Sequence, residues 1–239
     1  MNTVTSTPTS TPSSSPAPTL VVLDMAGTTV ADGGLVESAF SRAAQELGVE
    51  PGSADHAEKL DYVRATMGES KITVFRALFG TEETAQRGNS AFERAYAELV
   101  DGGQCEPLPG AEEAIRELRA QGRKVVLTTG FARTTQDAIL DALGWQDIAD
   151  LTLCPADAGR GRPHPDMVLT ALLRTGAESV QHVAVAGDTA YDMLSGVRAG
   201  AAVVAGVTSG AHDEPRLRAA GATHVLGSVA ELPALLGGS

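Results

Sequence analysis

Short apolar runs that end in polar or glycine-containing turns recur along the chain. Four of them have the length of a buried strand, at residues 20–23, 124–127, 183–186 and 202–207. Near-continuous apolar strands are typical of parallel sheets that are covered on both faces. Between these runs the sequence favours helices at 111–121, 135–143, 166–175 and 191–199. The alternation predicts an α/β fold with a Rossmann-like parallel sheet.

Residues 31–106 interrupt this alternation. Four helices are predicted there, at 35–47, 54–67, 71–79 and 90–100, with no strong strand between them. Glycine pairs flank the segment at positions 33–34 and 102–103. We therefore expect a helical cap domain, residues 31–106, inserted into a core domain made of residues 19–30 and 107–239. A fixed helical layer is the alternative.

The first 18 residues consist almost entirely of Ser, Thr and Pro. Such a segment has too little apolar surface to fold, so residues 1–18 are predicted to be a disordered tail. It has neither the basic nor the apolar region of a secretory signal, and no Arg for a transit peptide. No run of 18 apolar residues occurs, which argues against a membrane span.

Composition narrows the function classes. The formal net charge of −12 excludes a broad basic face for nucleic acid. Two cysteines, Cys105 and Cys154, do not make a disulfide framework and fit a reducing, cytoplasmic compartment. With 4% aromatic residues the core depends on Ala, Val and Leu. An acidic net charge is unfavourable for binding an anionic substrate, so the local charges of any site become important.

Carboxylates stand at the ends of two predicted strands. Asp24 follows the first apolar run, and Asp188 follows the third, with Asp192 one helical turn later. A carboxylate at a strand end is able to act as a nucleophile toward phosphorus and as a ligand of a hard cation. Each motif alone also fits a turn or a helix cap. The carboxyl ends of parallel strands meet at one edge, where ligands bind.

Two further segments supply groups for a phosphoryl moiety. Thr128 ends the second strand with a hydroxyl, and Thr129 and Gly130 add backbone N–H groups. Arg162, in Gly-Arg-Pro-His-Pro, offers a fork of donors that neutralises phosphoryl charge. His164 in the same segment either reaches this site or packs in its loop, and we favour the packing role.

The order of these four elements resembles the haloacid dehalogenase-type phosphohydrolases. Asp24 matches the nucleophile of the first motif, Thr128 the second motif, Arg162 the third, and Asp188 with Asp192 the acidic fourth. The resemblance extends from about residue 19 to the C-terminus. It implies a Rossmann-like core, Mg²⁺ as cofactor and an aspartyl-phosphate on Asp24.

The same resemblance implies a metal held by the Asp24 carboxylate, the Ala26 carbonyl and Asp188, with Asp192 in support. It places substrate contacts at the following residues: Thr28, Met67, Gly68, Thr129 and Gly130. The substrate is then a small phosphonate or phosphate ester, and dimerisation through the cap is a further implication that no sequence feature tests.

The residue type at position 26 distinguishes two groups of enzymes within this family. Ordinary phosphatases carry an Asp two residues after the nucleophile, which protonates the leaving alcohol; here the residue is Ala26. The Asp-x-Ala-Gly-Thr-Thr form resembles the phosphonoacetaldehyde hydrolases, or phosphonatases, which cleave a carbon–phosphorus bond. In that branch a cap lysine in Met-Gly-x-x-Lys, preceded by an Arg, forms an imine with the substrate. Arg64, Met67 and Gly68 match this motif, and Lys71 matches the lysine.

Two positions depart from the phosphonatase pattern. Val74 stands where that branch has a histidine, a proton shuttle, and Phe131 stands where a tyrosine is usual. Glu69 is a substitute shuttle or an exposed helix acid. We therefore predict a phosphonatase-like, Mg²⁺-dependent hydrolase with Asp24 as nucleophile and Lys71 as imine former. The alternatives are a phosphate-monoester phosphatase and a non-catalytic phosphate-binding module.

Overall fold

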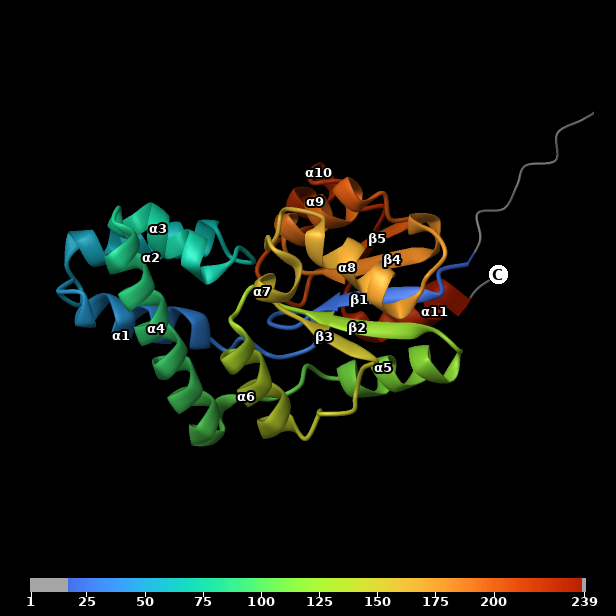
Figure 1. The fold of residues 1–239 in the computed structure, drawn as a ribbon, viewed down its shortest axis with the longest axis horizontal. Coiled ribbons are helices and arrows are strands. Elements are labelled where there is room, and N and C mark those ends of the chain that lie inside the picture. Colours follow the sequence, from blue (N-terminus) through green and yellow to red (C-terminus); the bar gives the residue numbers. More distant parts are fainter. Residues whose placement is uncertain (1–16, 238–239) are drawn as a thin grey trace, which may run out of the picture.

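A six-stranded parallel sheet forms the centre of the larger part of the molecule (Figure 1). The computed structural model describes residues 17–237, so the predicted tail lies almost wholly outside the described residues. The strand order is β3-β2-β1-β4-β5-β6. The strands are β1 (Leu20–Asp24), β2 (Lys124–Thr128), β3 (Leu151–Leu153), β4 (Val183–Gly187), β5 (Val203–Val207) and β6 (His224–Leu226). This confirms the predicted α/β class.

Both faces of the sheet are covered, as the apolar strands predict. Side chains of β1 alternate between two apolar clusters: Val21 and Leu23 belong to one, and Leu20 and Val22 to the other. Strands buried on both faces need apolar residues at every position. The covering helices are α5 (Ala111–Ala120), α6 (Arg133–Leu143), α7 (Pro155–Ala158), α8 (Asp166–Thr175), α9 (Ala190–Ala199), α10 (Glu214–Ala219) and α11 (Leu232–Gly237).

The two edge strands, β3 and β6, were not predicted from the sequence. Each has three residues, and their side chains are mostly half-buried or exposed. A strand of this length carries too few apolar positions to stand out from a loop. The two segments are strands because they pair with β2 and β5, and this pairing arises only in the tertiary structure.

Four helices form a separate helical block beside the sheet (Figure 1). They are α1 (Leu35–Glu46), α2 (Ala54–Ala65), α3 (Lys71–Phe79) and α4 (Glu82–Leu99). Helix α4 begins at Glu82, not at residue 90 as predicted, and Gly88 lies inside it. A Cβ at Gly88 would lie 2.6 Å from a ring carbon of Phe75. The glycine that obscured the helical pattern therefore allows close packing of α4 on α3.

Two antiparallel connections join the helical block to the sheet. The Ala31 N–H donates to the Glu106 carbonyl at 2.9 Å, and the Leu108 N–H donates to the Thr29 carbonyl at 3.0 Å. Gly103, in the second connection, has a φ of 75°, which favours glycine. The division into a core and a mobile cap at residues 31–106 stays a prediction.

Aromatic side chains gather between the helical block and the sheet. Phe131, which follows β2, packs on Phe92 and Tyr96 of α4, with ring centroids 6.1 and 4.7 Å apart. Phe75 and Phe40 continue the cluster inside the block. The scarce aromatic residues thus stabilise the contact between the two parts, where large rings bury the most apolar area.

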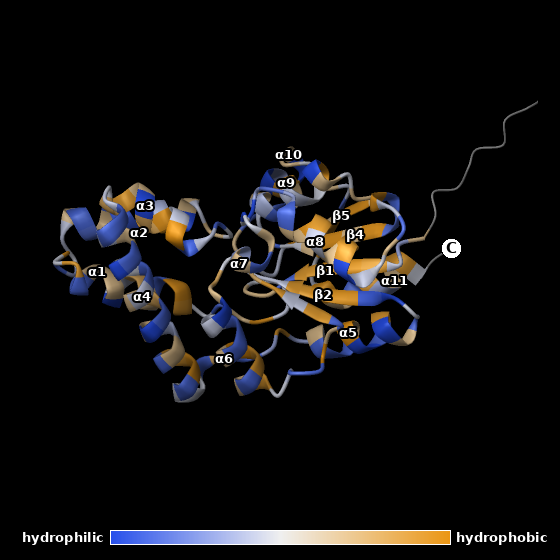
Figure 2. Cartoon of the chain, in the orientation of Figure 1, coloured by the Kyte–Doolittle hydropathy of each residue, from blue (hydrophilic) through white to orange (hydrophobic). Residues whose placement is uncertain are grey.

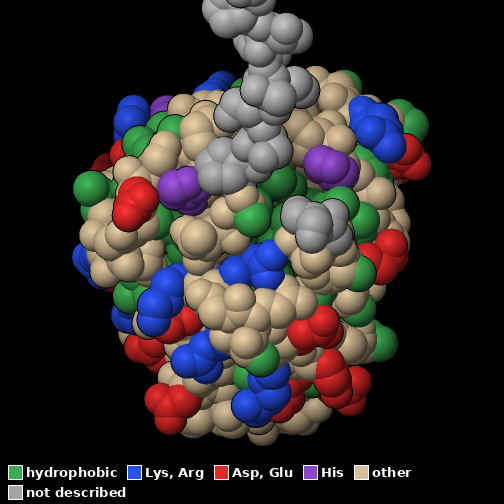
Figure 3. All heavy atoms as spheres, turned by 90° about the vertical axis from the view of Figure 1, so that its right-hand side faces the viewer, with side chains coloured by type: hydrophobic (Ala, Val, Ile, Leu, Met, Phe, Trp, Pro, Cys, Tyr) green, Lys and Arg blue, Asp and Glu red, His purple; other side chains and the backbone are tan. Residues whose placement is uncertain are grey.

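The surface is polar and mixed in charge. Apolar residues concentrate on the strands and on the inner faces of the helices (Figure 2). On the face drawn in Figure 3, acidic and basic side chains are interspersed rather than gathered by sign. Among the helices of residues 17–237, none is long and apolar enough to cross a membrane.

Candidate active site

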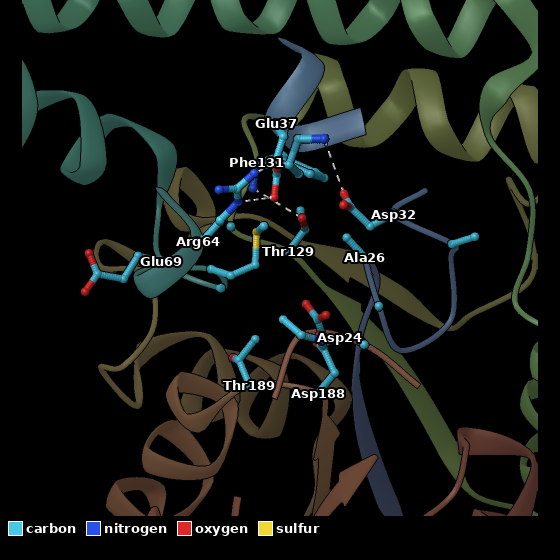
Figure 4. Close-up of a pocket in the computed structure, with 18 of the residues that line it drawn as sticks. Asp24, Ala26, Asp32, Glu37, Arg64, Glu69, Thr129, Phe131, Asp188 and Thr189 are labelled. Atoms are coloured by element: carbon cyan, nitrogen blue, oxygen red, sulfur yellow. Dashed lines mark hydrogen bonds and ion pairs between the residues drawn. The ribbon is translucent and has the colours of Figure 1, made fainter. Parts of the chain in front are cut away.

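The carboxyl ends of β1, β2 and β4 bring the predicted residues to one edge of the sheet. Asp24 is paired in register with Thr128, and Asp188 directly follows β4, the other neighbour of β1. Above them lies a cavity of about 480 Å³ between the sheet and the helical block (Figure 4). Asp24, Asp188 and Arg162 line it from the side of the sheet.

A buried acidic cluster forms its floor. One carboxylate oxygen each of Asp24, Asp188 and Asp192 lie within 4.8 Å of one another. Arg162 Nη1 lies 2.6 Å from Asp24 Oδ1 and also pairs with Asp192. Three carboxylates and one guanidinium leave this buried cluster with an excess of negative charge, which is unfavourable unless a cation is added.

The pKa values of the cluster reflect this excess. Burial raises the pKa of Asp24 to about 6, although the Arg162 guanidinium opposes the change. Burial and the neighbouring Asp24 and Asp192 carboxylates hold the pKa of Asp188 well above its usual range. Hard oxygen donors that repel one another in a buried site fit a divalent cation such as Mg²⁺.

Asp188 is held rigidly. Its Oδ2 accepts from the Ala211 N–H at 2.7 Å, and its Oδ1 accepts from the Thr28 hydroxyl at 3.4 Å. Gly27 and Gly210 pass so close that a Cβ on either would overlap its carboxylate. Thr28, a predicted substrate contact, is fully buried behind Asp188 and does not line the cavity.

Asp192 is occupied by local contacts. It accepts from the Thr189 N–H at 3.0 Å in a capping box that begins α9, and its second oxygen pairs with Arg162. This placement agrees with a supporting role. Thr128 is likewise buried, and its hydroxyl donates to the Leu23 carbonyl at 3.3 Å.

Lys71 lies at the first position of α3 and lines the cavity from the side of the helical block. Only 8% of its surface is exposed. Burial, reinforced by the Arg162 charge and opposed by nearby carboxylates, lowers the pKa of Lys71 to about 8. Its Nζ lies 5.5 Å from the centroid of the Phe131 ring. A lysine of this kind holds a useful fraction of neutral amine near pH 7.

The loop before Lys71 rests on the end of β2. The Lys71 N–H donates to the Gly130 carbonyl at 3.3 Å, and a Cβ at Gly130 would lie 2.7 Å from the Glu69 carbonyl oxygen. Met67, Gly68, Thr129 and Gly130 all line the cavity, so these four predicted substrate contacts lie together.

Glu69, Val74 and His164, which the sequence analysis also considered, lie in three different environments. Glu69 stands at the rim, with its carboxylate directed away from Asp24 (Figure 4). Burial, reinforced by the Glu69 carboxylate, raises the pKa of Tyr191 to about 12. Val74 is buried in the apolar core of the block. His164 is exposed and does not line the cavity, and its backbone carbonyl accepts from the Ser195 hydroxyl at 2.9 Å; the packing role of its side chain stays a prediction.

Two acids of the cavity, Asp32 and Glu37, were not singled out from the sequence. Asp32 lies on the wall, and Glu37 holds Arg64, a residue of the predicted lysine motif, through two hydrogen bonds of 2.8 and 2.7 Å (Figure 4). Neither acid belongs to a recognisable motif. Their position at the cavity arises from the placement of α1 against the sheet, which the chain pattern does not encode.

Comparisons with known proteins agree with this geometry. A family model described as a haloacid dehalogenase-like hydrolase matches residues 18–200. Phosphonoacetaldehyde hydrolase from Bacillus cereus is 30% identical over 192 residues, 75% of this chain and 72% of that protein. Probable phosphatase IndB from Dickeya dadantii is 30% identical over 207 residues, 84% of this chain and 86% of that protein. A crystal structure of a phosphonoacetaldehyde hydrolase-like protein from Oleispira antarctica aligns with a TM-score of 0.80 and 26% identity, over 94% of this chain and 93% of that one.

Proposed function

Because the chain belongs to the haloacid dehalogenase-like hydrolases and is a phosphohydrolase, we propose that it cleaves the carbon–phosphorus bond of a small phosphonate bearing a carbonyl group. One observation carries the proposal: a buried lysine of lowered pKa, Lys71, shares a cavity with the Asp24 carboxylate. Position 26, where an alcohol leaving group would need an acid, holds Ala26. The site therefore has an amine for activating a carbonyl and lacks the acid for releasing an alkoxide.

Phosphonate binding is assigned to groups at the strand ends. Arg162 is buried, and its Nε has no hydrogen-bond partner within residues 17–237, which leaves a charged donor for a phosphoryl oxygen. Gly130, which lines the cavity, adds a backbone N–H, whereas the Thr129 N–H already donates to the Leu153 carbonyl at 3.2 Å. A Mg²⁺ ion held by Asp24, Ala26 and Asp188 would neutralise the remaining phosphoryl charge.

The first chemical step takes place on Lys71. Its neutral amine adds to the substrate carbonyl, and loss of water gives an iminium ion. The Asp24 carboxylate then attacks phosphorus, so that an oxygen–phosphorus bond forms as the carbon–phosphorus bond breaks. The electron pair of the broken bond moves into the iminium group and gives an enamine on Lys71. An enamine is a far more stable leaving group than a free carbanion, which is the reason for imine formation.

The remaining steps restore the enzyme. Water hydrolyses the aspartyl-phosphate and releases phosphate. The enamine carbon takes up a proton, and hydrolysis of the resulting iminium ion releases an aldehyde and regenerates the amine. Closure of the helical block over the sheet would exclude bulk water from the first half of the reaction.

A phosphate-monoester phosphatase is the second candidate, because one relative of similar identity is named a probable phosphatase. In that case Lys71 binds the substrate without reacting, and another group must protonate the leaving alcohol. Ala26 disfavours this function.

Two measurements separate the candidates. A panel of phosphonates and phosphate esters, assayed for phosphate release with Mg²⁺, identifies the bond that breaks. Borohydride added with phosphonoacetaldehyde should reduce the imine to a stable adduct. The chain has only three lysines, so peptide mass spectrometry distinguishes Lys71 from Lys59 and Lys124. Turnover of phosphonate without an adduct on Lys71 refutes the imine step. Loss of turnover in Asp24→Asn excludes a mere binding module.

A further inference from the structure

Asp32, like Glu37 and Glu69, is an acid of the cavity that the steps above do not use. It lies on the connection between β1 and α1, and Figure 4 shows its carboxylate on the cavity wall above Asp24. Oδ1 accepts from the Val36 N–H at 3.4 Å and Oδ2 from the Gly34 N–H at 3.3 Å. These bonds fix the carboxylate at the start of α1 while it remains open to the cavity.

The charge of Asp32 favours the protonated form of Lys71. Among the charged groups around Lys71, which include Arg162, Asp24 and Glu69, Asp32 has the largest electrostatic effect on the pKa of Lys71, and it raises that pKa. Burial raises the pKa of Asp32 and lowers that of Lys71, so both groups move toward their neutral forms. Both side chains line the same cavity, in which a substrate carbonyl bound to Lys71 would also lie.

The other acids that line the cavity are engaged elsewhere. Glu69 is directed away from Asp24, and Glu37 is paired with Arg64 through two hydrogen bonds of 2.8 and 2.7 Å (Figure 4). Asp24 and Asp188 belong to the phosphoryl site. The Asp32 carboxylate lies outside the phosphoryl site, and its hydrogen bonds come from backbone N–H groups.

We infer that Asp32 carries the proton for imine formation on Lys71, an inference that rests on the proposed function. Lys71 in its ammonium form gives one proton to the Asp32 carboxylate, and the resulting carboxylic acid protonates the carbonyl oxygen as the neutral amine adds. The N–H⁺ of the carbinolamine then gives a second proton to Asp32, which passes it to the carbinolamine hydroxyl. The hydroxyl leaves as water, and the iminium ion and the Asp32 carboxylate remain. The same group works in reverse when the iminium ion is hydrolysed, so no proton is consumed.

A purely electrostatic role makes the opposite prediction. The Asp32 charge favours the ammonium form of Lys71, so its removal would increase the neutral amine and accelerate imine formation near pH 7. Loss of a proton carrier slows the same step by about 10²-fold or more. The sign of the change in Asp32→Asn therefore distinguishes the two roles.

The experiment measures the rate at which phosphonoacetaldehyde and borohydride label Lys71 at pH 7. In Asp32→Asn, whose amide oxygen still accepts a backbone N–H at the start of α1, we expect labelling to slow by about 10²-fold. In Asp32→Ala, added formate should restore part of the rate. Glu69→Gln is the matched rival variant, and thermal unfolding reports whether each variant is folded.

The labelling experiment has separate results for the role of Asp32 and for the imine itself. Labelling of Asp32→Asn at the native rate or faster overturns the inference, as does a slowing confined to Glu69→Gln. An Asp32→Ala variant that is folded, slow and insensitive to formate also counts against it. Absence of any Lys71 adduct in the native enzyme, with phosphate esters turned over, refutes the proposed imine and this inference with it.

Discussion

The charge of Lys71 should destabilise the folded protein, and its replacement tests this without any substrate. Its side chain is 8% exposed, and burial lowers its pKa from 10.5 to about 8. A difference of this size corresponds to about 3 kcal/mol of unfavourable free energy when the group is charged. We predict that Lys71→Met, which keeps length and removes charge, raises the free energy of unfolding by up to about 3 kcal/mol at pH 7.

The effect of the Lys71 charge on the free energy of unfolding should depend on pH in a defined direction. Below pH 8 the lysine is protonated in both states, and the folded state carries the full unfavourable charge. Between pH 8 and 10.5 the folded protein loses the proton while the unfolded chain keeps it, so native stability rises with pH. Above pH 10.5 both states are neutral, and the advantage of Lys71→Met should vanish.

Urea denaturation of the metal-free proteins at pH 7 and at pH 10.5 measures the effect. For a domain of this size, the gain at neutral pH corresponds to a rise in Tm of roughly 6–12 °C. Lys124→Met is the control, because the Lys124 side chain is 58% exposed and its pairing with Asp150 lies at the surface. If Lys71→Met does not raise the free energy of unfolding at pH 7, the buried charge does not destabilise the fold. If it raises the free energy of unfolding equally at both pH values, apolar burial rather than loss of charge is the cause.

Further predictions follow from the site. Imine trapping on Lys71 should rise with pH and reach half its maximum near pH 8, as read from labelling rates; a midpoint above pH 10 contradicts it. Ala26→Asp should increase phosphate-ester hydrolysis by about 10²-fold, and an unchanged rate argues against a missing acid. Gly130→Ala places a Cβ 2.7 Å from the Glu69 carbonyl oxygen and should lower kcat/KM about 10²-fold, whereas Gly102→Ala, whose Cβ would meet Gln104 Nε2 at an ordinary 3.8 Å, should not. Mg²⁺ should raise the Tm, and Asp188→Asn should abolish most of that rise.

The acidic net charge is compatible with an anionic substrate because the cavity has its own charges. Arg162 and Lys71 lie in it, and a divalent cation would neutralise two of the carboxylates on its floor. Elsewhere the surface carries mixed charges, which have little influence at the site because salt screens them beyond about 10 Å.

Local chemistry in the sequence determined the fold class and the strand-end residues. Four apolar runs predicted the central strands, since a parallel sheet buried on both faces requires such runs. Asp24, Thr128 and Asp188 were predictable because each directly follows or ends a strand, and parallel strands end at the same edge. The start of α4 and the strands β3 and β6 were missed, because Gly88 and the brevity of the strands hide their periodicity.

Only the tertiary structure decided the arrangement on the other side of the cavity. Whether Lys71 is solvated or buried depends on how α3 packs against the end of β2, and this packing involves residues far apart in the sequence. Asp32 carries no motif, and its relation to Lys71 exists only because the helical block folds back over the sheet. Burial and the distances between charges determine pKa values, and both are properties of the folded chain.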